Sequence, residues 1–119
     1  MSATSLLVVI SSAPYNGSDT AWNSLRLAKT AAAHDSRVRV FLINGGVDVG
    51  RKELKPPDNY FNLAEMLGEV VEAGAEVQYC KTCIDRCGVG EGEMIDKITP
   101  GSMAILYEWI MTSDKVISF

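Results

Sequence analysis

Short apolar runs of strand length alternate with segments of helical periodicity along this chain. Each run is rich in aliphatic and β-branched residues, as in strands that are buried on both faces of a sheet. We predict these strands at residues 5–12, 38–43, 75–80, 94–98 and 115–119. Between them, helices are predicted at residues 18–32, 61–73 and 100–111. Strands that alternate with helices form βαβ units, so the chain is predicted to have an α/β fold with a mainly parallel sheet covered on both sides.

The turns and loops place polar and reactive residues at one edge of that sheet. Ligands of parallel sheets bind at the carboxyl ends of the strands. The turn at residues 14–17, the turn Asn44–Gly46 and Cys80 all follow predicted strands and are expected at this edge. Residues 47–60 are predicted to form a long loop, and residues 80–92 a loop with room for one helical turn.

Length and composition exclude several classes of protein. The 119 residues suffice for one domain, which is predicted to span residues 1–119. The net charge of -4 argues against nucleic acid and anionic membranes as partners. No window approaches the ~20 apolar residues of a membrane span, and the apolar run Leu6–Ile10 is too short for a signal peptide. The chain is therefore expected in the cytoplasm, where its three cysteines are reduced.

The cysteines are the most specific chemical feature of the sequence. All three lie within eight residues, as Cys80, Cys83 and Cys87, and a glycine-rich stretch follows them. Their odd number argues against a purely structural set of disulfides. They could pack as small buried hydrophobic side chains, but a glycine-rich loop is an unusual place to fill a core.

Two further interpretations use the Cys80-x-x-Cys83 motif. A structural zinc site needs four thiolate or imidazole ligands, yet the only histidine, His34, lies at the predicted end of the first helix. Three cysteines could instead hold an iron–sulfur cluster with a fourth ligand from outside. The pair also resembles a thioredoxin-type motif for disulfide exchange, although here it follows the third predicted strand rather than the first.

A fourth interpretation is sulfur transfer. A thiolate at a strand end can accept a sulfur atom and hold it as a persulfide, if it is exposed and has a lowered thiol pKa. The predicted helical turn after Cys80 and the nearby Arg86 are expected to lower that pKa. We therefore predict that Cys80 is the carrier, with Cys83, Cys87 and Arg86 as further site residues.

Several segments resemble the DsrE/DsrF family of small sulfur-transfer proteins, and the similarity covers nearly the whole chain. Three segments resemble the family's first, second and terminal strands with their turns: LLVVISSAPYNGSDTAWNSLRLA, VFLINGGV and SDKVISF. The most specific segment, CKTCIDRCGV, is similar to the cysteine segments of TusD-type and YchN-like members. The resemblance implies a parallel, five-stranded, three-layer α/β/α fold and assembly as trimers or hexamers.

The resemblance also implies roles for single residues. Cys80 matches the sulfur-accepting cysteine of the family, and Cys83 matches a second cysteine found in some members. Cys87 stands where the family commonly has an arginine before Gly88, and the arginine of this chain is displaced to Arg86. A cysteine at this position makes exchange between Cys80 and Cys87, or between Cys83 and Cys87, conceivable.

The expected function is that of a sulfur carrier or sulfurtransferase subunit. It would take sulfur from a donor protein and pass it to an acceptor protein, without a cofactor or metal. Two alternatives stay open: a non-catalytic assembly subunit of a sulfur-relay complex, and a redox-active or metal-binding cysteine protein. Assembly into a homo-oligomer or hetero-oligomer is expected, because one sheet and three helices cannot bury every aromatic side chain. The candidates for exposure are Tyr15, Tyr60, Phe61, Tyr107 and Trp109.

Overall fold

Strands and helices alternate in the computed structural model, which describes residues 4–54, 56–57 and 61–119. The strands are β1 (Ser5–Ile10), β2 (Arg37–Leu42), β3 (Glu76–Cys80), β4 (Thr99–Gly101) and β5 (Lys115–Ser118). The α-helices are α1 (Thr20–Ala33), α2 (Leu63–Glu72), α3 (Lys81–Arg86) and α4 (Met103–Thr112). Two 3₁₀ helices are η1 (Asn44–Gly50) and η2 (Glu91–Glu93).

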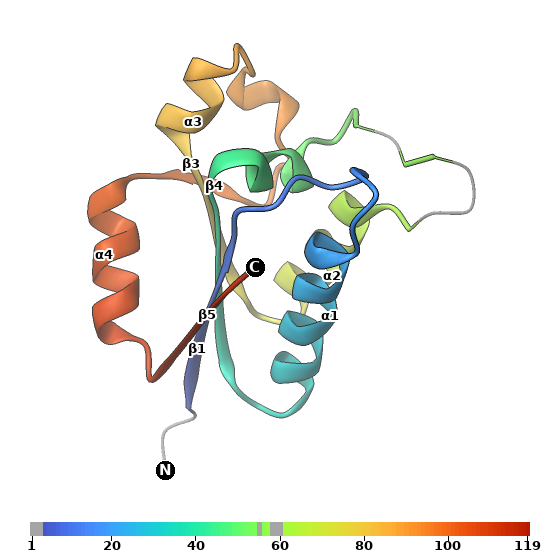
Figure 1. Ribbon diagram of the computed structural model, residues 1–119. Coiled ribbons are helices and arrows are strands. Elements are labelled where there is room, and N and C mark those ends of the chain that lie inside the picture. Colours follow the sequence, from blue (N-terminus) through green and yellow to red (C-terminus); the bar gives the residue numbers. More distant parts are fainter. Residues whose placement is uncertain (1–3, 55, 58–60) are drawn as a thin grey trace.

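The strands form a five-stranded sheet in the order β4-β3-β2-β1-β5, and every neighbouring pair is parallel. Figure 1 shows α1 and α2 on one face of the sheet, α4 on the other, and α3 beyond the carboxyl end of β3. The prediction of a three-layer α/β/α fold with a parallel sheet is therefore confirmed.

The centre of the sheet is the apolar core of the molecule. In β1, the side chains of Leu7, Val8 and Ile10 are fully buried, and in β2 the same holds for Val40 and Leu42. Burial of such a side chain stabilises the fold by about 1.5–3 kcal/mol relative to leaving it exposed. This is why the aliphatic runs of the sequence became central, doubly covered strands.

The helix α2 covers one face of this core and shows clear end signals. Its buried residues Leu63, Leu67 and Val70 recur at helical spacing. The N-cap Asn62 accepts a hydrogen bond from the Glu65 N–H at 3.1 Å, and Gly74 follows the helix with φ of 107°. The predicted glycine stop is thus confirmed, while the helix begins two residues later than expected.

The predicted strand at residues 94–98 is wrong. Met94 and Ile98 are buried, but the segment turns toward the end of η1, where the Ile95 N–H donates to the Gly50 carbonyl at 2.9 Å. The fourth strand is β4 instead, in a stretch that the sequence assigned to the start of a helix. Its Gly101 is required there, because a Cβ atom would lie only 3.0 Å from Phe41 and closer still to Gln78.

The predicted long loop at residues 47–60 is wrong in its first part. Residues 44–50 form η1, whose Val47 and Val49 are buried against the carboxyl end of the sheet. Gly46 permits this close packing, since a Cβ atom on it would collide with the carbonyl group of Ile10. This glycine- and valine-rich segment therefore covers the end of the sheet and does not form an open loop.

The aromatic side chains predicted to be exposed divide into several groups. Phe61 and Tyr107 are 62% and 65% exposed, which confirms the prediction for these two. Trp109 is buried, because it packs edge-on against Phe41 at a centroid distance of 6.2 Å. Tyr15 is half-buried, and Tyr60 lies outside the described residues.

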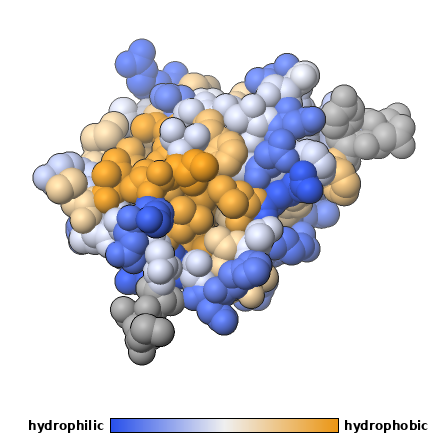
Figure 2. Space-filling model, turned by 60° about the horizontal axis from the view of Figure 1, so that its bottom comes forward, coloured by the Kyte–Doolittle hydropathy of each residue, from blue (hydrophilic) through white to orange (hydrophobic). Residues whose placement is uncertain are grey.

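The largest exposed apolar side chains gather on α4 and on the edge strand β5. We call them the α4–β5 apolar residues: Met103, Tyr107, Ile110, Met111, Val116 and Ile117. Figure 2, which turns the lower end of Figure 1 toward the viewer, shows a broad apolar patch on that side. No helix among the described residues is long and apolar enough to cross a membrane.

Candidate functional site

Cys80 lies at the junction of a strand and a helix, as the sequence predicts. It is the last residue of β3, where it is in register with Gly101 of β4, and it is also the N-cap of α3. Its Sγ accepts a hydrogen bond from the N–H of Cys83 at 3.2 Å. The carboxyl end of the sheet therefore holds the Cys80 sulfur in a fixed position.

The helical turn for which the predicted loop left room is present directly after Cys80, where α3 covers Lys81–Arg86. Ile84 is fully buried and anchors α3, while Lys81 and Asp85 form an ion pair on its outer side. Gly88 ends the helix with φ of 72°, and the Val89 N–H returns to the Ile84 carbonyl at 2.9 Å. This pattern of a left-handed glycine followed by a buried apolar residue is a Schellman motif.

The chain beyond α3 is tied back to η1 by charged side chains. Arg51 contacts Asp48 at 3.3 Å and Glu93 at 3.0 Å. Glu93 also accepts a hydrogen bond from the Gly90 N–H at 2.8 Å, and these contacts hold the pKa of its carboxyl group below the usual value. The glycine-rich stretch is therefore joined to the sheet end through η1.

The three thiols differ in their access to solvent. Cys80 is buried, with 7% of its surface exposed, whereas Cys83 is half-buried and Cys87 is exposed. All three are free thiols. The predicted site residues are thus brought together on one short helix, but only Cys87 is freely accessible.

A small pocket of about 290 Å³ opens next to the two outer thiols. Its lining residues are Asn44, Cys83, Arg86 and Cys87. Asn44 comes from the turn after β2, so one of the turns expected at this edge meets the cysteine segment there, whereas Cys80 and residues 14–17 do not line the pocket. Asn44 was predicted only as part of a turn, and its backbone φ of 54° is unusual for a residue other than glycine.

The prediction of an acidic Cys80 thiol is wrong. Burial raises the pKa of Cys80, and the neighbouring Cys83 side chain raises it further. The N–H of Cys83 lowers the pKa through its hydrogen bond, but this effect is smaller than that of burial. Arg86, expected to help, is exposed and points into the outer pocket. At neutral pH the resting Cys80 is therefore a neutral thiol.

The metal interpretation finds no support among the residues that the structure describes. They contain no group of three or more His, Cys, Asp and Glu side chains arranged to hold an ion. His34 is the C-cap of α1, as predicted.

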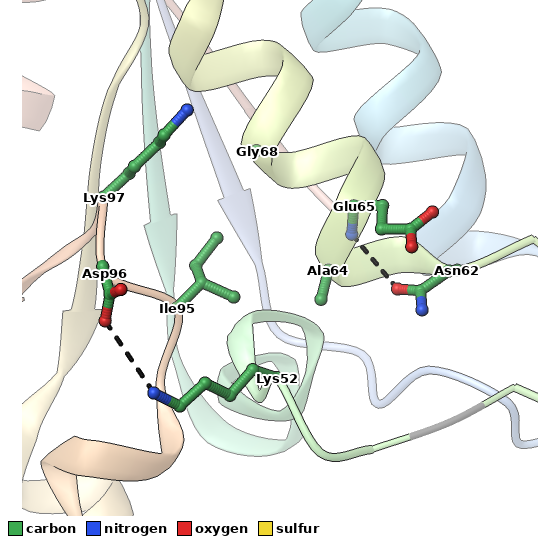
Figure 3. A pocket seen from close by; sticks show the side chains of 8 residues that line it. All are labelled: Lys52, Asn62, Ala64, Glu65, Gly68, Ile95, Asp96 and Lys97. Atoms are coloured by element: carbon green, nitrogen blue, oxygen red, sulfur yellow. Dashed lines mark hydrogen bonds and ion pairs between the residues drawn. The ribbon is translucent and has the colours of Figure 1, made fainter.

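A second pocket, of about 320 Å³, lies away from the thiols and was not predicted. Its lining residues are Lys52, Asn62, Ala64, Glu65, Gly68, Ile95, Asp96 and Lys97 (Figure 3). Its cations are already paired, since Lys52 contacts Asp96 at 3.8 Å and Lys97 contacts Glu72. This pocket offers neither a nucleophile nor an unpaired lysine.

Comparisons with known proteins agree with the fold and identify the family. A profile of the DsrE/DsrF-like family matches residues 4–119. The chain is 40% identical to the uncharacterized protein MK0008 of Methanopyrus kandleri over 114 residues, covering 96% of this chain and 93% of the relative. It is 34% identical to the protein YchN of Escherichia coli over 116 residues, covering 96% and 97%. The crystal structure of YchN superposes with a TM-score of 0.88 at 33% identity, covering 98% of this chain and 99% of the other. The chain belongs to the DsrE/DsrF-like family.

Proposed function

We propose that this protein is a sulfur carrier that holds sulfane sulfur as a persulfide on Cys80 and relays it between partner proteins. Family membership supports a role in sulfur relay. The observation that carries the proposal is the position of Cys80, which ends β3 and has its Sγ hydrogen-bonded at 3.2 Å to the next turn of chain. A pure scaffold has no need of a thiol in such a position.

The chemistry is a transfer between two thiols without net oxidation. The Cys80 thiolate attacks the outer sulfur of a donor persulfide, and a new S–S bond forms. The S–S bond of the donor persulfide breaks, and the cysteine sulfur of the donor leaves as a thiolate. This thiolate takes up the proton lost by Cys80. The same exchange in the opposite sense delivers the sulfur to an acceptor thiol.

Burial of Cys80 suits storage better than rapid attack. A neutral, 7% exposed thiol reacts slowly with oxidants and alkylating agents, because the thiolate is the nucleophile. A persulfide at the same position would be shielded from reductants of the size of glutathione. We therefore propose that loading requires the incoming persulfide to be brought within reach of the buried sulfur.

We also propose that a second copy of this chain covers the α4–β5 apolar residues. Edge strands with exposed Val and Ile side chains favour pairing with another chain, and β5 is such an edge. The same surface carries both acidic Glu108 and basic Lys115, so two copies can meet without repulsion between like charges.

Mass spectrometry after incubation with inorganic polysulfide tests the carrier function. The Cys80 peptide is expected to gain ~32 Da, the mass of one sulfur atom. A Cys80→Ser variant should show no gain on that peptide. If the variant bound as much sulfur in total as the wild type, the assignment of Cys80 as the carrier would be contradicted. An intramolecular Cys80–Cys83 disulfide would instead indicate a redox protein, and no modification of any cysteine would indicate an assembly subunit.

A further inference from the structure

The three cysteines form a line on one side of α3. Cys83 and Cys87 are four residues apart on one face of the helix, and Cys80 is its N-cap, whose Sγ accepts the Cys83 N–H at 3.2 Å. The helical geometry extends through Cys87, whose N–H donates to the Cys83 carbonyl at 3.2 Å. The thiols are therefore stacked along the helix at intervals of about one turn, or roughly 5 Å.

This spacing permits transfer between neighbouring thiols but not across the whole line. Cys80 and Cys87 are about two turns, or roughly 10 Å, apart along the axis, which is too far for direct attack. Cys83 lies between them, and its own N–H already contacts the Cys80 sulfur at 3.2 Å. Any sulfur that moves between the first and last thiol must pass through Cys83.

Access to solvent increases along the same line. Cys80 is 7% exposed, Cys83 is half-buried, and Cys87 is exposed. The thiol of a partner protein can reach Cys87 directly, whereas burial obstructs its approach to Cys80. Storage and exchange thus fall on different residues.

The pocket at the outer end of the line suits an anionic sulfur. It is lined by Cys83, Cys87, the amide side chain of Asn44 and the guanidinium of Arg86. Among the described residues, Arg86 forms no ion pair, so its charge is available in the pocket. A persulfide anion on Cys83 or Cys87 would gain charge-assisted hydrogen bonds from these donors.

We infer that sulfur enters and leaves through Cys87 and reaches Cys80 by way of Cys83, an inference that rests on the proposed function. In each step a thiolate attacks the outer sulfur of the neighbouring persulfide. One S–S bond forms as another breaks, and the released cysteine becomes a thiol when it takes the proton of its attacker. The two outer cysteines are thus exchange residues of the carrier rather than spare thiols.

Two acceptors of different size separate this relay from direct exchange at Cys80. The full-length protein is loaded with inorganic polysulfide, freed of excess reagent and divided between cyanide and glutathione. Cyanide is small enough to enter the site, whereas glutathione requires an exposed sulfur. Thiocyanate and glutathione persulfide are quantified over time in the wild type and in Cys83→Ser and Cys87→Ser. Thr82→Ala, an exposed change on the same helix, is the matched control.

Both cysteine variants are expected to release sulfur to cyanide within about twofold of the wild-type rate. Their release to glutathione should be roughly tenfold slower than that of the wild type, because access limits thiol exchange. A variant that can no longer be loaded on Cys80 by polysulfide also supports the relay, since entry then depends on the missing thiol. Wild-type rates to glutathione in both variants, with Cys80 loaded, would overturn the relay alone. A wild-type protein without persulfide on any cysteine would overturn the carrier function itself.

Discussion

At the scale of single residues, the environment of Cys80 determines its reactivity more than its neighbours in sequence do. Its sulfur receives an N–H hydrogen bond, which favours the thiolate, yet burial outweighs this bond and raises the pKa. The consequence is a thiol that stays protonated until its surroundings change. A docked donor that brings a positive charge close to the sulfur would provide such a change.

The pH dependence of alkylation tests this balance. A raised pKa means that less thiolate is present at neutral pH, so the reaction midpoint of Cys80 should lie above the ~8.5 of free cysteine. Cys83→Ala removes one of the raising contributions and should move the midpoint down, while burial keeps it above the free value. A free cysteine peptide serves as the reference, and a Cys80 midpoint below that of the peptide would contradict the prediction.

A second residue couples stability to acid. The Asp114 carboxylate accepts hydrogen bonds from the backbone N–H of Ser5 at 2.8 Å and from its hydroxyl group, which lowers the pKa of Asp114. This contribution is fully present above the unfolded pKa of about 3.9 and is lost as the pH falls through the lower folded value. Asp114→Asn should therefore destabilise the protein at neutral pH and reduce the loss of stability in acid.

Urea unfolding at several pH values checks the Asp114 prediction. Asp19→Asn is a suitable control, because the Asp19 side chain is exposed and makes no capping hydrogen bond. Equal acid sensitivity of wild type and Asp114→Asn would show that the contact with Ser5 is not coupled to protonation.

At the scale of elements, α3 is a short helix that depends on its two ends. Ile84 anchors its inner side, and Gly88 ends it in a conformation that other residues adopt with strain. A helix of six residues has no stability of its own, so these contacts decide whether the thiols stay aligned.

Substitution of Gly88 by alanine measures how strongly this end is fixed. The added methyl group meets no atom within 4 Å, so the cost is the backbone strain of φ 72°, about 1 kcal/mol. Gly92→Ala is the matched control, since its site is equally open and has no left-handed φ. Denaturant unfolding should separate the two variants, and equal stabilities would mean that α3 ends in another way.

The sequence predicted most of the fold and the place of Cys80, but it did not predict the burial of that thiol. Continuous apolar runs identified β1, β2 and β3, because these strands are covered on both faces of the sheet. Residues 94–98 have the composition of a strand, but their apolar side chains pack against η1, a tertiary contact that no local pattern reveals. Likewise, α3 is too short to show periodicity. The pKa of Cys80 depends on how closely β4 and α3 enclose it, which becomes visible only in three dimensions.

At the scale of the whole molecule, the reactive edge lies away from most of the apolar surface, and only Met103, at the start of α4, lies close to the strand that pairs with Cys80. The thiols stand at the carboxyl end of the sheet, whereas the start of β5 and the end of α4 lie toward its opposite end (Figure 1). Copies that associate through the α4–β5 apolar residues would therefore leave α3 open to partners.

Charge placed on this surface should weaken self-association. Tyr107→Glu and Met111→Glu, both at residues that are 65% exposed, are expected to shift the protein toward the monomer without unfolding it. Thr30→Glu, an exposed change on α1, is the matched control. Sedimentation velocity at micromolar concentration measures the mass of the assembly. A wild-type monomer would refute self-association, and unchanged oligomers in both variants would place the interface elsewhere.

The depth of Cys80 also sets how long a loaded carrier keeps its sulfur. Leakage from an exposed persulfide is governed by collisions, and hence by the concentration of reductants around it. Leakage from beneath α3 is governed by how often that helix loosens, which is a property of the protein alone. A change such as Gly88→Ala would then shorten the lifetime of the stored sulfur without altering a single thiol. Retention of the sulfur would be set by the stability of the helix rather than by the chemistry of the cysteines.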